Sequence, residues 1–320
     1  MPSNNPDPTG TLTGAENKKP VVLLVGPTAV GKTEVAIQLA QQLNAEIVSA
    51  DSRLFYRGMD IGTAKPTPAE RAGVLHHLID IADPDEILSL AVFQEKATQA
   101  IHEIHARQRL PLVVGGTGQY MRAVAEGWTP PAVEPEPKLR LELEQLANQR
   151  GSYWLHEKLA GMDADAAQAI DPRNLRRTVR ALEVILTTGQ KFSAQRRQIE
   201  SPYLLTTLGL SRPRPELYER VDQRIEQMFE NGFLGEVQTL LDQGYDPGLP
   251  TLSAIGYREC IRVLKGEWTE EQAKAEIRRA TRIFVRRQAN WFKESDPNIS
   301  WFSVEAGVVE KIGAHIRSAL

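Results

Sequence analysis

Apolar positions along the chain alternate between short continuous runs and helical stripes. The run Val21–Val25 is valine or leucine throughout and breaks into glycine at Gly26. The helical pattern that follows, predicted over 34–43, has one apolar stripe formed by Val35, Leu39 and Leu43. This segment is therefore predicted to form a strand, a glycine loop and a helix.

Later apolar runs predict further strands over 45–51, 110–114 and 204–210. A helix is predicted over 85–107, where the apolar residues at helical spacing are Leu90, Phe93, Ala97, Ala100, Ile101 and Ile104. Alternating strands and helices indicate a parallel sheet, whose ligands lie outside the carboxyl ends of the strands. Asp51, at the end of the second strand, is thus expected near the glycine loop. The Gly- and Pro-containing stretch 56–66 is expected to lie over the same site.

The glycine loop has the spacing Gly26-x4-Gly31-Lys32-Thr33 of a phosphate-binding P-loop. Its backbone N–H groups and the helix N-terminus would surround an oligophosphate, with a charge from Lys32 and a Mg²⁺-binding hydroxyl from Thr33. The expected binding residues are Gly26, Pro27, Thr28, Ala29, Val30, Gly31, Lys32 and Thr33. A plain turn between strand and helix is the alternative. The third strand runs into Gly115-Gly-Thr117 rather than the Asp that nucleotide hydrolases use, which argues against routine ATP hydrolysis.

Length and composition divide the chain into several parts. At 320 residues it exceeds one average domain. Residues 1–19 have almost nothing to bury and are predicted to be a disordered tail. Four prolines within 130–137 mark a linker, after which the composition becomes helical and polar. We therefore predict an α/β P-loop core over 20–127 and 201–320, with an inserted helical lobe over 128–200 and a helical C-terminal part.

Arginines gather on predicted helix faces. A helix capped by Asp171 and ended by Gly189 has an apolar stripe formed by Leu175, Val179, Leu182 and Leu186. Its other side carries, with no acid among them, Arg173, Arg176, Arg177 and Arg180. A helix over 273–293 carries a second basic stripe formed by Arg279, Arg282, Arg286 and Lys293, opposite Ile277, Thr281, Phe284, Gln288 and Trp291. Such faces favour an anionic polymer over a solvated basic surface.

A helix predicted over 216–230 places Arg220 and Arg224 on one face, because they are four residues apart. Paired arginines beside a P-loop suggest contacts with pyrophosphate, and surface pairing with Glu216 or Glu219 is the alternative. The stretch 253–258 is a glycine-containing helix opening, whose Tyr257 and Arg258 could reach a base or a phosphate.

Composition narrows the class of protein. The net charge of −3 argues against a chain coated in positive charge but leaves room for local basic patches. No apolar run approaches the ~18 residues of a membrane span, and the N-terminus lacks a signal-peptide core, so a cytoplasmic location is expected. One cysteine, Cys260, excludes internal disulfides and a Cys-rich zinc module, and a small buried role is expected for it.

Together these motifs resemble one family, the tRNA dimethylallyltransferases, which place an isopentenyl group on N6 of an adenosine next to the anticodon. The resemblance covers about residues 20–305, through the P-loop, Asp51-Ser52 and the stretches 56–66, 114–120, 171–184, 256–258 and 286–292. Arg53–Phe55 and Gln119 depart from the family pattern. The chain is similar to bacterial-type members, since it has no C-terminal Cys/His finger.

The resemblance implies that the P-loop binds the pyrophosphate of dimethylallyl pyrophosphate rather than ATP, with Mg²⁺ as cofactor. It implies Asp51 as the general base, Thr117 as a residue that holds the adenosine, and Arg224 with Arg220 as contacts of the leaving pyrophosphate. It also implies anticodon stem-loop contacts by Asp51, Ser52, Arg53, Leu54, Thr117, Arg140, Arg173, Asn174, Leu175, Arg176, Arg177, Ser253, Ala254, Ile255, Gly256, Tyr257 and Arg258. A monomer is expected.

Other functions remain open at this stage. One alternative is a P-loop small-molecule kinase, which would turn over ATP. Another is a free-adenine-nucleotide isopentenyltransferase. Neither of these enzymes needs two arginine faces. A non-catalytic RNA-binding protein with a nucleotide switch is a third hypothesis. Asp51 argues against it, because a pure binding protein has no use for a carboxylate at the reaction centre.

Overall fold

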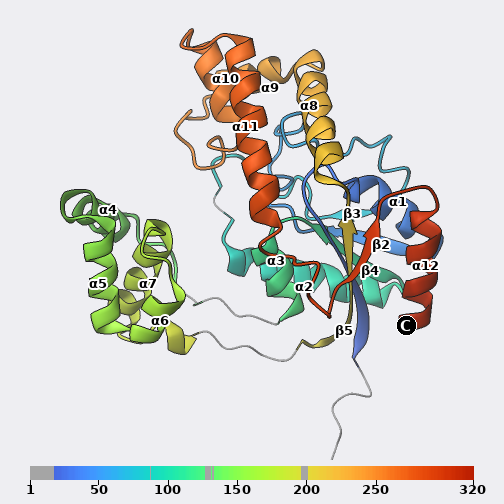
Figure 1. Ribbon diagram of the computed structural model, residues 1–320, viewed down its shortest axis with the longest axis horizontal. Helices are drawn as coiled ribbons and strands as arrows, with labels where there is room; N and C mark the ends of the chain where they lie inside the picture. The colour runs from blue at the N-terminus through green and yellow to red at the C-terminus, as the bar shows by residue number, and fades with distance from the viewer. Residues whose placement is uncertain (1–17, 87, 127–130, 132, 196–200) are drawn as a thin grey trace, which may run out of the picture.

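The computed structural model describes residues 18–86, 88–126, 131, 133–195 and 201–320. One sheet of six parallel strands has the order β3-β2-β4-β1-β5-β6. The strands are β1 Lys19–Val25, β2 Ala45–Ser49, β3 His76–His77, β4 Leu110–Gly115, β5 Tyr203–Ser211 and β6 Ser300–Ser303. The predicted α/β fold with a parallel sheet is confirmed, and the predicted return strand pairs with β1 (Figure 1).

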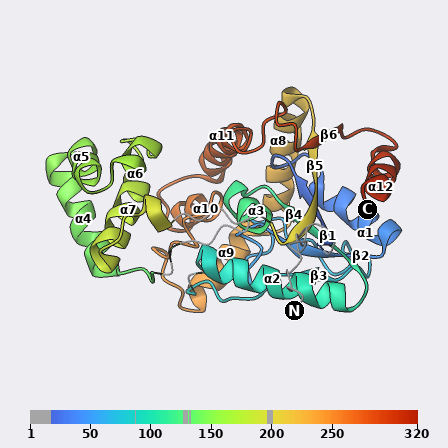
Figure 2. The same cartoon turned by 90° about the horizontal axis from the view of Figure 1, so that it is seen from below.

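Helices cover both faces of the sheet. The side chains of β1 point alternately to the two faces and are apolar on both, so both faces must be buried. Val21, Leu23 and Val25 pack into one core, whereas Val22 and Leu24 pack into another. The helices of the first core are α2 Leu90–Ala106, α3 Gly118–Ala125, α9 Phe233–Asp242 and α10 Tyr257–Leu264. Those of the second are α1 Lys32–Leu43, α8 Arg214–Glu230, α11 Glu270–Gln288 and α12 Val308–Ala319. Figure 2 shows α2 on one side of the sheet and α8 and α12 on the other.

Four helices and a short 3-10 turn form a lobe beside this core (Figure 1). They are α4 Pro137–Arg150, α5 Ser152–Met162, α6 Ala164–Ala169, α7 Leu175–Thr188 and η1 Ser193–Gln195. The lobe has an apolar core of its own, which includes Leu143, Leu155, Leu159, Val179 and Leu182. The predicted lobe boundaries at 128 and 200 lie outside the described residues, as do residues 1–17 of the predicted tail. Residue 19, predicted as tail, begins β1.

Several predicted helix boundaries are wrong. Helix α2 begins at Leu90, because Ser89 caps it by accepting from the Val92 N–H. Helix α7 begins at Leu175, because Asn174 rather than Asp171 accepts the capping N–H, although Gly189 ends it in the left-handed conformation as expected. Helix α11 ends at Gln288, five residues before the predicted end.

The predicted apolar stripes are shorter than expected. Val179 and Leu182 of α7 are buried, but Leu186 is 52% exposed. Phe284 and Trp291 are also exposed, so they do not continue the stripe of α11.

Cys260 is buried as predicted, and this burial raises the pKa of its thiol to about 12. In the part of the chain that the structure describes, no helix has the length and apolar character needed to cross a bilayer.

Candidate active site

The P-loop joins the carboxyl end of β1 to α1, as the sequence predicts. Gly31 has a φ of 105°, which an L side chain rarely adopts, and this left-handed residue turns the chain into the first helical residue, Lys32. The loop therefore presents backbone N–H groups and a helix N-terminus together, the arrangement that favours a bound phosphate.

Three side chains from distant parts of the sequence hold the loop. The Arg220 Nε donates to the Ala29 carbonyl (2.8 Å), and the Arg212 Nε donates to the Val30 carbonyl (3.1 Å). Gln288 Oε1 accepts from the Thr28 N–H (2.8 Å). Arg220 thus contacts the loop, as expected for a residue near pyrophosphate, whereas Glu216 accepts from Arg212 instead.

Gln288 is a site residue that the sequence reasoning missed. Its Nε2 also donates to the Gly116 carbonyl (3.2 Å), so one buried amide links the P-loop to the turn after β4. The sequence placed Gln288 on the apolar stripe of its helix. A polar residue at such a position was the available signal, because a buried amide needs hydrogen-bond partners.

A cluster of three charged side chains lies beside the P-loop. The Lys32 Nζ donates to the carbonyls of Gly26 (2.9 Å) and Pro27 (2.8 Å). Desolvation lowers the pKa of Lys32 to about 8; the nearby Asp51 carboxylate opposes this shift and Arg224 adds to it. Desolvation also lowers the pKa of Arg224, again opposed by Asp51. The structure therefore brings together the predicted base and two predicted pyrophosphate contacts.

The lowered pKa of Lys32 predicts a pH-dependent affinity for inorganic pyrophosphate. Lys32 is charged below its pKa of about 8 and loses this charge as the pH rises further. Affinity should therefore fall between pH 7 and 9, by up to about tenfold per pH unit at the upper end. Isothermal titration calorimetry measures this directly.

Lys32→Arg is the matched control, because a guanidinium stays protonated throughout this range. Its affinity should show only the pH dependence of pyrophosphate itself. Identical profiles for the two proteins would contradict a Lys32 pKa near 8.

Asp51 and Thr117 lie at the same edge of the sheet. Gly115, at the end of β4, is so close to Ala50 that a Cβ on it would lie 2.6 Å from the Ala50 carbonyl oxygen. Thr117, two residues later, is the N-cap residue that precedes α3. The Arg53 N–H donates to Asp51 Oδ1 (3.0 Å), which orients the carboxylate. A carboxylate and a hydroxyl residue thus follow the carboxyl ends of two neighbouring strands.

Two of the predicted tRNA-contacting segments meet on the core. The Arg53 guanidinium donates to the Thr251 carbonyl (3.2 Å), which ties the Asp51–Leu54 turn to the segment containing Ser253. Ser253 and Arg258 are exposed, but Ala254 is buried and Tyr257 is fully buried. The prediction that the Tyr257 side chain reaches a base or a phosphate is therefore wrong.

The predicted acid-free arginine face of α7 is also wrong. Arg173 makes a two-point ion pair with Asp171 (2.9 and 2.6 Å). Glu183 is fully buried and accepts from Arg180 (2.6 Å) and from both sides of the Arg140 fork (2.7 and 2.8 Å). Two of the four arginines are therefore paired with acids, Arg173 at the surface and Arg180 inside the lobe, while Arg176 is exposed on the surface.

The second predicted basic stripe is compensated in the same way. Arg279 pairs with Glu276 of its own helix (2.6 Å), and Arg282 pairs with Asp222 of α8 (2.5 Å). Arg286 is exposed in the last turn of α11. The exposed basic character predicted for this stripe therefore remains only at the end of the helix. Sequence periodicity could not show the pairing of Arg282, because its acid lies on a neighbouring helix.

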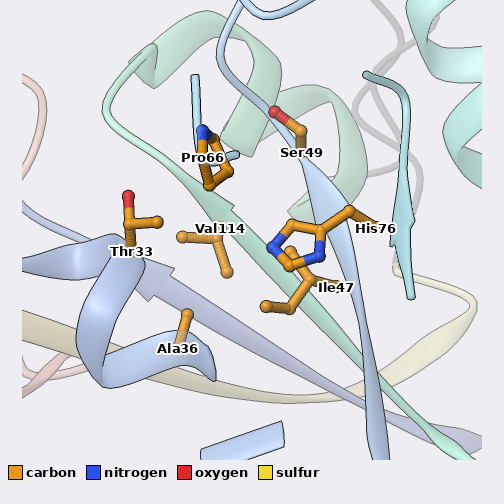
Figure 3. Close-up of a pocket in the computed structure, with 7 residues that line it drawn as sticks. All are labelled: Thr33, Ala36, Ile47, Ser49, Pro66, His76 and Val114. Atoms are coloured by element: carbon orange, nitrogen blue, oxygen red, sulfur yellow. The ribbon is translucent and has the colours of Figure 1, made fainter. Parts of the chain in front are cut away.

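A small cavity of about 30 Å³ lies between α1 and the strands β2, β3 and β4. Its walls are formed by Thr33, Ala36, Ile47, Ser49, Pro66, His76 and Val114, with the His76 ring on one side and Thr33 on the other (Figure 3). This volume is enough for roughly two water molecules and too small for a nucleotide.

The donor set at the loop fits a metal ion that is shared with a substrate. Among the described residues, no three His, Cys, Asp or Glu side chains are grouped to hold a metal by themselves. The Thr33 hydroxyl is exposed at the N-terminus of α1. A hard cation such as Mg²⁺ would take this oxygen together with phosphate oxygens and water.

Comparisons with known proteins agree on one family. Residues 54–295 match the family model described as IPP transferase. A tRNA dimethylallyltransferase of Roseiflexus sp. strain RS-1 is 51% identical over 297 residues, which cover 93% of this chain and 97% of that protein.

Solved structures give the same result. The tRNA isopentenylpyrophosphate transferase of Bacillus halodurans is 43% identical, with a TM-score of 0.71 over 95% of this chain and 97% of that one. A eukaryotic dimethylallyltransferase acting on tRNA is 27% identical, with a TM-score of 0.75 over 94% of this chain and 77% of that one.

Proposed function

The chain belongs to the IPP transferase family of tRNA-modifying enzymes, and from this membership we propose that it transfers a dimethylallyl group from dimethylallyl pyrophosphate to N6 of adenosine 37, next to the tRNA anticodon. Pyrophosphate is the second product. The observation that carries the proposal is the position of the Asp51 carboxylate, which interacts with both Lys32 and Arg224 beside the P-loop.

Asp51 acts as the general base in this proposal. The N6 amino group attacks C1 of the dimethylallyl group, and the bond from C1 to the pyrophosphate oxygen breaks. The N6 proton passes to the Asp51 carboxylate, so positive charge does not remain on N6. The Arg53 N–H holds Asp51 Oδ1, and Thr117 at the end of the next strand helps to hold the adenosine.

The P-loop and two cations receive the leaving group. Negative charge develops on the pyrophosphate oxygens as the C1–O bond breaks, and Lys32 and Arg224 are placed to stabilise it. Arg220 acts through the loop, because its Nε fixes the Ala29 carbonyl. The other residues of the loop supply the surrounding N–H groups, apart from Pro27, which has no N–H, and Thr28, whose N–H donates to Gln288.

Mg²⁺ fits this site as a cofactor that Thr33 and the donor pyrophosphate would hold. When bound, it would neutralise part of the pyrophosphate charge. We also propose that the protein works as a cytoplasmic monomer.

The tRNA contact combines the core and the lobe. On the core, the half-buried Asp51–Leu54 turn is tied to the segment that carries the exposed residues Ser253 and Arg258. Reaching a base inside a stacked loop requires extruding it, which costs roughly a few kcal/mol that backbone contacts must offset. Arg176 of the lobe is exposed and suited to such a phosphate contact.

Arg176→Gln is expected to weaken tRNA binding and to flatten the plot of log K against log salt by about one unit. The reason is that a phosphate-contacting arginine displaces a condensed counterion, which the glutamine does not. Filter binding between 50 and 200 mM salt, the usual range for such plots, measures the slope.

Arg180→Gln is the matched control on the same helix. Arg180 pairs with buried Glu183, so its loss should lower the melting temperature of the protein rather than the salt slope. A salt slope that is unchanged by Arg176→Gln would place the lobe away from the tRNA backbone.

The proposed reaction itself is tested by mass spectrometry. Purified protein is incubated with dimethylallyl pyrophosphate, Mg²⁺ and unmodified tRNA, and the tRNA is then digested to nucleosides. An adenosine with one added C5H8 unit is the expected product. ATP hydrolysis without this product would instead favour a kinase.

A further inference from the structure

We propose that Glu236 is a positioning residue for this reaction, which holds the loop over 60–65 so that the Thr63 carbonyl aligns Arg224 with the pyrophosphate. The proposal rests on the proposed function, because it concerns the same leaving-group site. Glu236 lies on α9, outside the P-loop and outside every motif singled out in the sequence.

The Glu236 carboxylate accepts four hydrogen bonds. Three come from consecutive backbone N–H groups, those of Asp60 (2.9 Å), Ile61 (2.6 Å) and Gly62 (3.2 Å). The fourth comes from the Tyr257 hydroxyl (2.6 Å). A carboxylate that satisfies three successive amides fixes the backbone of that turn far more tightly than a neutral acceptor would.

The fixed turn leads directly to Arg224. Gly62 is followed by Thr63, whose carbonyl accepts from the Arg224 Nη2 (3.1 Å). Arg224 is otherwise a desolvated cation next to Asp51. The position of the Thr63 carbonyl therefore determines where the guanidinium stands relative to the P-loop.

Lys65 fixes the other end of the loop. Its buried ammonium donates to the Tyr56 carbonyl (2.7 Å), to Asp60 Oδ1 (2.6 Å) and to Asp80 Oδ1 (2.5 Å). The loop is thus held both by the Lys65 ammonium and by the Glu236 carboxylate. A segment without regular structure acquires one defined conformation by this means.

Aromatic packing supports the same contact. The Phe233 and Tyr257 rings meet edge to face at 5.1 Å, and a Cβ on Gly62 would lie 2.2 Å from the Phe233 ring. Burial, followed by the Glu236 charge, raises the pKa of Tyr257 far above its ordinary value. Tyr257 therefore keeps its proton and donates to Glu236, which explains why this tyrosine faces inward.

Glu236→Gln is the decisive variant, since it keeps the shape but offers an NH₂ group to backbone donors. We expect about a tenfold loss of kcat/KM for dimethylallyl pyrophosphate, with the dissociation constant for tRNA unchanged. Tyr257→Phe should also lower kcat/KM for dimethylallyl pyrophosphate, but by less, because three of the four hydrogen bonds to Glu236 remain. Asp242→Asn, on the same helix and paired with Gln238, is the matched control and should change neither parameter.

A double-mutant cycle with Arg224→Ala tests whether Glu236 acts through Arg224. If it does, Glu236→Gln should cost almost nothing once Arg224 is absent. Full additivity, or an equal loss of tRNA affinity, would overturn the proposal and assign Glu236 a purely structural role.

Calorimetry with inorganic pyrophosphate separates this proposal from the reaction itself. Glu236→Gln should weaken pyrophosphate binding in the protein that keeps Arg224. It should leave pyrophosphate binding unchanged in the Arg224→Ala variant. This readout does not depend on prenyl transfer, so it stands even if mass spectrometry finds no modified adenosine. Unchanged pyrophosphate affinity in both backgrounds would overturn the positioning role of Glu236.

Discussion

Asp51→Asn is expected to slow prenyl transfer by about 10² to 10⁴ while tRNA still binds. The amide is close in shape to the carboxylate and can still accept from the Arg53 N–H, so the turn after β2 should keep its conformation. The amide cannot accept the N6 proton, however, and that proton must leave as the new C–N bond forms. The expected loss therefore appears in the chemical step.

Single-turnover kinetics at saturating tRNA and dimethylallyl pyrophosphate isolates this step. Quenched samples are digested, and the modified nucleoside is quantified against time. Asp51→Glu is an informative companion, because it restores a base at a different distance and should recover part of the rate. A rate for Asp51→Asn close to that of the unaltered protein would assign proton removal to another group.

Strands β1, β2, β4 and β5 and the turn of the P-loop were predicted correctly because their signals are local. The short edge strands β3 and β6 were missed, because two to four residues carry too little apolar pattern to mark a strand. A run such as Val21–Val25 is apolar on both faces, as a central parallel strand must be, and the loop spacing follows directly after it. The position of Asp51 was predicted from the rule that ligands lie outside the carboxyl ends of parallel strands, and not from the residues next to it in the sequence.

Contacts between distant parts of the chain could not be predicted in this way. Periodicity placed Arg180 on a basic face, but it could not show that Glu183 turns inward to meet Arg140 from another helix. The same limit applies to Gln288, whose partner Thr28 lies 260 positions away. Periodicity shows which face a residue occupies, whereas its partner depends on how the helices pack.

Tyr257 shows how a correct element can carry a wrong functional prediction. The glycine-initiated helix was expected and is present, but tyrosine can serve either a surface or a core. The half-buried carboxylate of Glu236, on α9, accepts from the Tyr257 hydroxyl and so decides between these roles. Its sequence position gave no sign of this pairing.

Lys32→Met is expected to lower kcat/KM for dimethylallyl pyrophosphate by about 10² to 10³, the usual loss when one oxyanion donor is removed. Affinity for tRNA should change little, because Lys32 donates to carbonyls of the P-loop and lies beside Arg224. Steady-state kinetics with each substrate varied in turn gives the comparison. Equal losses for both substrates would contradict the assignment of Lys32 to the leaving group.

The same substitution should stabilise the substrate-free protein. The pKa of Lys32 is about 8 in the folded protein and about 10.4 in an unfolded chain, so folding disfavours the charged form. This cost is fully present below pH 8 and disappears as the pH rises toward 10.4. Lys32→Met should therefore raise the melting temperature at pH 7, and the gain should shrink at pH 10. Differential scanning calorimetry at the two pH values measures both effects, and a lower melting temperature at pH 7 would mean that Lys32 stabilises the empty loop instead.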